Sequence, residues 1–319
     1  MHQTGKLFYS LTSNITACLL LFISAGCLTI AHAADNKGPV VVTIKPLYSL
    51  VTQLTEGIET PALLMKQPQS PHHYNMRPSE RRLLSDARVI IWTGPQMEAY
   101  LTKILQQQKN TTVIISAMQA DKLHLLGKRA KHGHERDHHH SKDLSGAEDH
   151  AVDPHIWLSS RNAAAISQHI ADRLISHDPK NADLYNKNLH QLITRINQTR
   201  DFINTTLEHR AQPYIAFHDA FHYFDDEYRL NYIDAINYDE ETGTSLKRLR
   251  QVRTKIKKHN IQCLVYQSPK PAIVDSLEKQ TSVKAVALDP LGLNINDEKN
   301  AWFELMRQLA VNFNQCLKP

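Results

Sequence analysis

Four side chains that can bind a metal ion stand at turns or just after predicted strands. They are His72, His155, His218 and Asp289. Three neutral imidazoles and one carboxylate suit a tetrahedral Zn²⁺ ion, whereas Mn²⁺ prefers more oxygen ligands. Any one of these His residues alone is more simply explained as a hydrogen-bonded loop residue. The prediction of a zinc site therefore depends on all four together, brought from distant parts of the chain.

The segment from His218 to His222 allows a different interpretation. Its sequence, His-Asp-Ala-Phe-His, has the spacing of the His-Glu-x-x-His helix of zinc metallopeptidases, with Asp219 in place of the Glu that serves as general base. Residues 213–217, however, have the pattern of a strand, which places His218 at its end and His222 in the next element. A zinc metallo-hydrolase is therefore the alternative function. We expect no catalytic residue, and we expect His73 and His222 beside the site or on the surface.

A low-complexity segment, about 124–150, separates the first two predicted ligands from each other. It has almost no apolar residue after Leu126, so it cannot bury enough surface to fold, and we expect a mobile loop. Weak auxiliary metal ligands would come from its centre. These are His132, His134, His138, His139 and His140. Two interpretations stay open: a weak collector of Zn²⁺, or a solvated insertion.

The composition is that of an ordinary globular protein with an excess of one residue type. Of 319 residues, 41% are hydrophobic and 22% are charged, which excludes a disordered or collagen-like chain. The net charge of +5 is spread along the chain, which argues against nucleic-acid binding. The chain contains 19 His, the commonest metal-binding side chain. Its length favours two compact lobes with separate cores.

Short β-branched runs alternate with helical patterns, and this order must position the four ligands. Strands are predicted at 40–44, 88–92, 112–115, 214–217, 230–236, 263–266 and 283–288. Helices are predicted at 46–54, 97–107, 161–174, 180–209, 245–259, from 271, and 298–316. The alternation predicts an α/β fold: two similar lobes with mainly parallel sheets, joined by one long rigid helix. The metal site would lie in the cleft between the lobes, where the carboxyl ends of strands meet.

The first 33 residues have the features of a secretory signal. Lys6 precedes an apolar stretch from Ile15 to Ile30, and Ala31-His32-Ala33 forms a cleavage site before Ala34. A lipid anchor on Cys27 is the alternative. No later apolar run is long enough to span a membrane, so we expect the mature chain to be soluble outside the inner membrane. The expected organisation is a signal peptide at 1–33, an N-terminal lobe at 34–179, a connecting helix at 180–209 and a C-terminal lobe at 210–319.

Removal of the signal leaves two cysteines, Cys263 and Cys316. In an oxidising compartment this pair suggests one disulfide, which would join a predicted strand to the end of the chain. Two unpaired buried thiols remain the alternative. Metal binding by this pair is less favoured, because zinc sites built from Cys use closely spaced residues.

The chain resembles the zinc-binding receptors of bacterial ABC importers, the ZnuA type of the cluster A-I solute-binding proteins. The resemblance covers nearly the whole chain after residue 33. The motifs that carry it are Ser70–Tyr74, Arg77–Ser79, Val89–Trp92 with Gly94-Pro95, Met97–Ala99, Asp153–Leu158, Phe217–Phe221 and Leu288–Gly292. The His-rich segment also resembles the zinc branch. By the same resemblance, His218 indicates zinc, since manganese receptors usually place Glu there, and Cys263 and Cys316 form the family's disulfide.

The resemblance implies a function and a partner. We expect a high-affinity periplasmic receptor, a monomer, that captures Zn²⁺ and delivers it to an inner-membrane zinc ABC permease. It would not be an enzyme, because a closed four-ligand site leaves no position for an activated water. A metal-binding surface adhesin of the same fold is a third class. One departure concerns Gln267, which lies where relatives commonly carry Glu beside a Pro.

Overall fold

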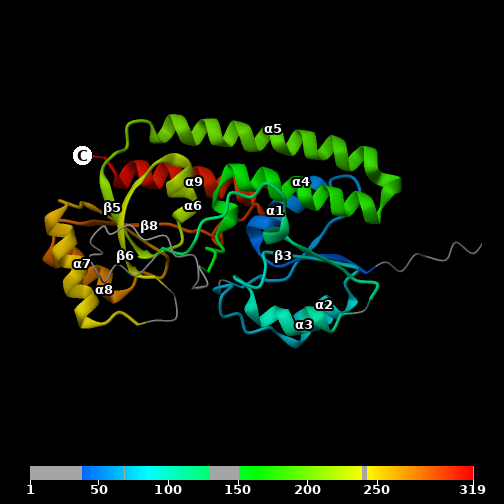
Figure 1. Ribbon diagram of the computed structural model, residues 1–319, viewed down its shortest axis with the longest axis horizontal. Helices are drawn as coiled ribbons and strands as arrows, with labels where there is room; N and C mark the ends of the chain where they lie inside the picture. The colour runs from blue at the N-terminus through cyan, green and yellow to red at the C-terminus, as the bar shows by residue number, and fades with distance from the viewer. Residues whose placement is uncertain (1–37, 68, 109, 130–150, 239–242, 319) are drawn as a thin grey trace, which may run out of the picture. The chain divides into compact units, whose positions relative to one another are not determined.

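The described residues form two four-stranded parallel sheets, one in each half of the chain (Figure 1). The computed structural model describes residues 38–67, 69–108, 110–129, 151–238 and 243–318. The first sheet consists of β2 (Ala62–Leu63), β1 (Val40–Val42), β3 (Val89–Trp92) and β4 (Val113–Ser116), in that order. The second consists of β6 (Asn231–Asn237), β5 (Pro213–His218), β7 (Cys263–Tyr266) and β8 (Lys284–Ala287). Because all the pairs are parallel, the carboxyl ends of the strands lie along one edge of each sheet.

Helices cover both sheets. The α-helices are α1 (Lys45–Leu54), α2 (Pro78–Asp86), α3 (Thr102–Gln106), α4 (Ser160–His177), α5 (Ala182–Leu207), α6 (His222–Tyr228), α7 (Leu246–Lys258), α8 (Ala272–Gln280) and α9 (Ala301–Cys316). Short 3₁₀ turns lie at η1 (Ala99–Leu101), η2 (Ala117–Gln119), η3 (Ile156–Leu158), η4 (Pro179–Asn181) and η5 (Glu298–Asn300). The predicted α/β fold with two parallel-sheet lobes is confirmed.

The strands of the first sheet are buried on both faces, which explains their unbroken apolar sequence. Side chains alternate between the two faces of a strand. Val40 and Val42 therefore face the main hydrophobic core, while Val41 packs in a second cluster that includes Leu84 of α2 and Leu105 of α3. Two apolar layers thus hold the sheet in place.

The second sheet repeats this arrangement. Ile215 and Leu264 point to one face, where they pack against Val252 of α7 and Val274 of α8. Tyr214 points to the other face and meets α9 there, with its ring centroid 5.1 Å from that of Phe313. The end of β5 is therefore fixed from both sides, and His218 is its last residue.

The main hydrophobic core includes residues of both halves of the chain. At its centre, the indole nitrogen of Trp302 donates to the carbonyl of Trp157, and the indole nitrogen of Trp157 donates to the carbonyl of Pro290, both at 2.8 Å. Helix α5 packs along α4 and α9 across the top of Figure 1. The expected separate cores are present only as the two smaller clusters, one in each half, because the main apolar core continues from one lobe to the other.

Most predicted helices and strands are present as helices and strands, but many of their first and last residues differ from the predicted ones. The long helix expected at 180–209 corresponds to α5, and 26 residues span roughly 39 Å. The lobe boundaries stay a prediction. The sequence patterns missed β2, which has two residues, and α2, in which Leu83 and Leu84 are the only large apolar residues. Helix α2 begins at Pro78. Its third residue, Glu80, accepts a 2.7 Å hydrogen bond from the backbone N–H of Arg77, which precedes the helix.

Cys263 and Cys316 form a disulfide, with a Cα–Cα distance of 5.3 Å. The bond joins β7, an interior strand of the second sheet, to the last turn of α9. Both half-cystines are buried. The disulfide prediction is confirmed.

Within the described residues, no helix is both long enough and apolar enough to cross a membrane. The predicted signal peptide and its cleavage site lie outside the described residues, as do most of the His-rich segment and its five auxiliary His. These features stay predictions.

The disulfide should stabilise the fold without affecting metal binding. Replacing both cysteines, Cys263→Ser with Cys316→Ser, opens a loop of 53 residues, so the chain-entropy model gives a loss of about 4 kcal/mol in unfolding free energy. Urea titration of the two proteins would measure it. Equal unfolding midpoints for the wild type and the double variant would contradict this prediction.

Candidate metal centre

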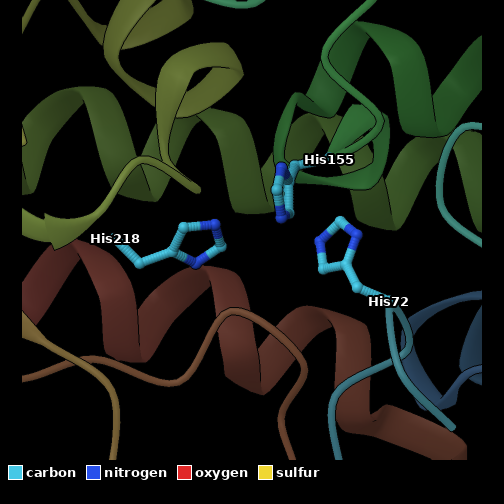
Figure 2. Close-up of side chains that lie close together, drawn as sticks. All are labelled: His72, His155 and His218. Atoms are coloured by element: carbon cyan, nitrogen blue, oxygen red, sulfur yellow. The ribbon is translucent and has the colours of Figure 1, made fainter. Parts of the chain in front are cut away.

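Three of the four predicted ligands come together. His72 lies in the loop between β2 and α2, His155 immediately precedes η3, and His218 ends β5. Each offers one ring nitrogen, and the three nitrogens all lie within 4.8 Å of one another. Figure 2 shows the three rings pointing toward a common space from three separate segments of the chain. Within the described residues, this is the one group of His, Cys, Asp or Glu with such spacing.

The rings meet edge to face rather than stacking on one another. The ring centroids of His155 and His218 are 5.5 Å apart, those of His72 and His155 are also 5.5 Å apart, and those of His72 and His218 are 6.2 Å apart. Each ring also offers one nitrogen to the group whose members lie within 4.8 Å of one another, as a shared metal ion requires. The geometry is that of a set of ligands rather than an aromatic stack.

Burial keeps the site suited to neutral imidazole. His155 and His218 are each 6% exposed, and the Nε2 atom of His72 is buried with no hydrogen-bond partner among the described residues. Burial, together with the neighbouring His155 and His218, lowers the pKa of His72 to about 3. His72 is therefore neutral at physiological pH, which is the form that binds a metal.

His155 is oriented by Asp153. The Nδ1 of His155 lies 2.8 Å from the Oδ1 of Asp153, which also accepts the backbone N–H of His155 at 3.0 Å. Burial raises the pKa of Asp153, but the charge of His155 and its hydrogen bonds outweigh this, and the net pKa lies below its usual value. Because the carboxylate accepts a hydrogen bond from Nδ1–H, the Nε2 lone pair is left for a metal. This arrangement is common in metal sites.

The three His lie at a strand end or in loops, from which their side chains can reach a shared metal ion. His218 ends an interior parallel strand, at the sheet edge where side chains emerge from the core. His72 and His155 each follow a proline, Pro71 and Pro154, which restricts the chain to a turn. Loops held by a packed scaffold are the usual source of binding residues.

Asp289 lies outside the group of three His. It follows β8 and is half-buried. Its Oδ1 accepts the backbone N–H of Leu291, and its Oδ2 accepts that of Asn294, both at 3.1 Å. The carboxylate shapes its own turn here, and its role as fourth ligand stays a prediction.

The metallopeptidase interpretation of the 218–222 segment is wrong. His218 ends a strand while His222 begins α6, so the two do not share one helix face. Asp219, the general base of that interpretation, is paired with Arg129 at 2.6 Å. His222 instead lies 3.7 Å from the carboxylate of Asp153, and His73 lies outside the group of three.

Sequence reasoning missed a buried ion-pair cluster beside the site. The Nη1 of Arg129 lies 2.6 Å from the Oδ1 of Asp219, and its Nη2 lies 2.7 Å from the Oδ2 of Asp225. Its guanidinium also lies 3.6 Å from the ring centroid of Tyr232, and the hydroxyl of Tyr214 donates to Asp225. Burial raises the pKa of Asp225 to about 7, with Arg129 opposing the rise. No sequence motif marks this cluster.

The described beginning of the His-rich segment is held by hydrogen bonds to the rest of the protein. The backbone N–H of His124 donates to the Oδ1 of Asn162 at 2.9 Å, and its Nε2 lies 3.0 Å from the carboxylate of Asp226. Gly127 pairs with Val152 in an antiparallel bridge. The expected loop therefore has an anchored first part.

Comparison with known proteins places the chain in one family. The family model described as "ZnuA: Zinc-uptake complex component A periplasmic" matches residues 40–316. The chain is similar to the "High-affinity zinc uptake system protein ZnuA" of Yersinia pestis, with 32% identity over 92% of this chain and 96% of that protein.

Two solved structures show the same fold. One is described as "Crystal structure of ZnuA", with a TM-score of 0.73 and 20% identity over 88% of this chain and 100% of the other. The second is a mutant structure of the laminin-binding adhesin (Lmb) from Streptococcus agalactiae, with a TM-score of 0.72 and 19% identity, over 88% of this chain and 100% of the other. The fold is thus shared by a ZnuA protein and by an adhesin, and the family model assigns this chain to the zinc-uptake family. The chain belongs to the ZnuA family of zinc-uptake solute-binding proteins, which are substrate-binding receptors and not enzymes.

Proposed function

We propose that this chain captures Zn²⁺ as cargo and delivers it to an ABC-type permease in the inner membrane. The observation that carries the proposal is the group of three imidazole nitrogens within 4.8 Å of one another. His72, His155 and His218 would bind the ion, and Asp289 would complete a tetrahedral set. The periplasm is the compartment in which such a receptor would work, and the predicted signal at 1–33 supports it.

The donor set favours zinc. Three imidazole nitrogens and one carboxylate match the ligands and the geometry that Zn²⁺ takes in proteins. Mn²⁺ lies at the weak end of the Irving-Williams order and prefers more numerous oxygen ligands. The orientation of His155 by Asp153 adds to this preference, because a fixed tautomer strengthens a nitrogen ligand.

Three observations favour transport over the other function classes. The relative from Yersinia pestis is named as a component of a zinc uptake system, and an uptake receptor needs a membrane permease to receive its cargo. The adhesin class rests on a shared fold alone, since the solved adhesin is 19% identical to this chain. Burial of the ligands also suits a carrier, which must hold the ion away from water until delivery.

Loss of any one imidazole should abolish high-affinity binding. In His72→Ala, His155→Ala and His218→Ala, zinc affinity should fall by about a hundredfold or more, because the remaining ligands leave the ion open to water. Competition titration with a zinc chelator would measure each affinity. Cells that lack this chain should regain growth in zinc-poor medium with the wild type and not with His155→Ala.

His73→Ala is the matched control, since His73 is adjacent to His72 but lies outside the group of three. It should bind zinc as the wild type does. Asp289→Ala should weaken zinc if its carboxylate is the fourth ligand. A wild-type protein without one tight zinc equivalent would refute the proposed function.

Metal preference should follow the ligand at position 218. In His218→Glu the site would have two imidazoles and two carboxylates, so the ratio of Zn²⁺ to Mn²⁺ affinity should narrow by roughly an order of magnitude or more. Parallel titrations of both proteins with both metals would measure it. An unchanged ratio would place His218 outside the metal's ligand set.

The metal-free protein should lose stability as the pH falls toward the folded-state pKa of His72. An unfolded His takes up a proton near pH 6.5, whereas folded His72 does so only near pH 3. Between these values the unfolded state binds more protons, so the unfolding free energy decreases as the pH decreases. His72→Ala should lose part of this slope. Urea titrations of metal-free wild type and variant at pH 7, 6 and 5 would test it, and identical slopes would be the contrary result.

A further inference from the structure

Arg129 contacts three side chains from different segments of the C-terminal half: Asp219, Asp225 and Tyr232. Its side chain is 16% exposed and is held between the carboxylates of Asp219 and Asp225, at 2.6 and 2.7 Å, over the ring of Tyr232. Those carboxylates are 6% and 3% exposed. Two buried carboxylates need a compensating cation, and the planar guanidinium can serve both at once.

On one side, the backbone beside Arg129 is joined to the segment that carries His155. The N–H of Lys128 donates to the carbonyl of Ala151 at 2.8 Å, and the N–H of Asp153 donates to the carbonyl of Leu126 at 2.9 Å. Asp153 in turn orients His155. The backbone beside Arg129 is thus fixed relative to His155.

On the other side, the guanidinium holds the segment that carries His218. Asp219 follows His218 directly, so a fixed Asp219 carboxylate restricts the backbone on which the imidazole stands. Asp225 extends the connection to α6. Arg129 therefore joins the His155 segment of the N-terminal half to the His218 segment of the C-terminal half.

We propose that Arg129 is a positioning residue of the metal centre, which keeps His218 at ligand distance from His155 and thereby slows the release of zinc. This rests on the proposed function, since it concerns how the captured ion is held. Without Arg129, the two buried carboxylates would repel each other, and the turn at Asp219 would move. The His218 ring would then lose its fixed distance from the other two.

The test compares two buried arginines of similar setting. Arg248 lies in the C-terminal half, 15% exposed, with its Nη2 2.5 Å from Asp234 and its guanidinium 4.9 Å from the ring centroid of Tyr238. Arg248→Met thus removes a comparable ion pair that has no connection to His155. Both single variants should lower the melting temperature of the metal-free protein. Zinc release into excess chelator, followed by stopped flow, would separate their effects.

We expect Arg129→Met to speed zinc release by roughly tenfold, the size of coupling found within one ion-pair network, and Arg248→Met to release zinc as the wild type does. The triple variant Arg129→Met, Asp219→Asn and Asp225→Asn removes both ion pairs of Arg129 and leaves no uncompensated carboxylate charge. It should fold more stably than Arg129→Met and still release zinc fast.

Equal release rates in Arg129→Met and Arg248→Met would overturn the positioning role. Wild-type release from the triple variant would also overturn it, because charge compensation alone would then account for Arg129. If the wild type binds no zinc tightly, the proposed function fails and this inference fails with it. If the wild type binds zinc and the variants do not differ, only this inference fails.

Discussion

The shared apolar core around Trp157 and Trp302 is the constraint on which the metal centre depends. His155 and His218 belong to different halves of the chain, so their nitrogens can meet only if the two sheets keep a fixed separation. The indole nitrogen of Trp302 donates to Trp157, and that of Trp157 donates across to Pro290. Both indoles are fully buried, and the ring of Trp157 lies 5.5 Å from that of His155. A shift between the lobes would have to break these hydrogen bonds inside a packed core, which is costly.

The charges around the group of three His also favour the binding of a cation. Burial keeps His72 neutral, because a protonated imidazole would be poorly solvated beside two others. The nearest carboxylates have partners of their own: Asp153 holds His155, and Asp219 is paired with Arg129. His72 thus remains uncharged, and these two carboxylates are each paired with a neighbouring side chain. Such a site can accept a divalent ion without first expelling a proton from His72.

Much of the fold and part of the site could be predicted from sequence, for identifiable reasons. Buried parallel strands have unbroken β-branched runs, so Val40–Val42 and Val89–Trp92 were recognisable without tertiary information. His218 could be placed at the end of a strand for the same reason. Helix α2 was missed because its start depends on a turn and a cap rather than on an apolar stripe. Arg129 was placed in an expected mobile loop, because charged sequence indicates exposure unless a partner is known, and its partners lie 90 and 96 residues away.

The sequence by itself determined which chemistry was available: three imidazoles at turns or strand ends, a disulfide pair, and an alternation of strands and helices. These are local properties, set by side-chain type and by the conformational preferences of neighbouring residues. The tertiary structure decided which of these residues meet. It grouped His72, His155 and His218, left Asp289 shaping its own turn, and separated His218 from His222. It also extended the main apolar core through both lobes and placed Arg129 between two carboxylates. Such outcomes depend on distances between residues far apart in the chain, which are set by packing and not by local sequence.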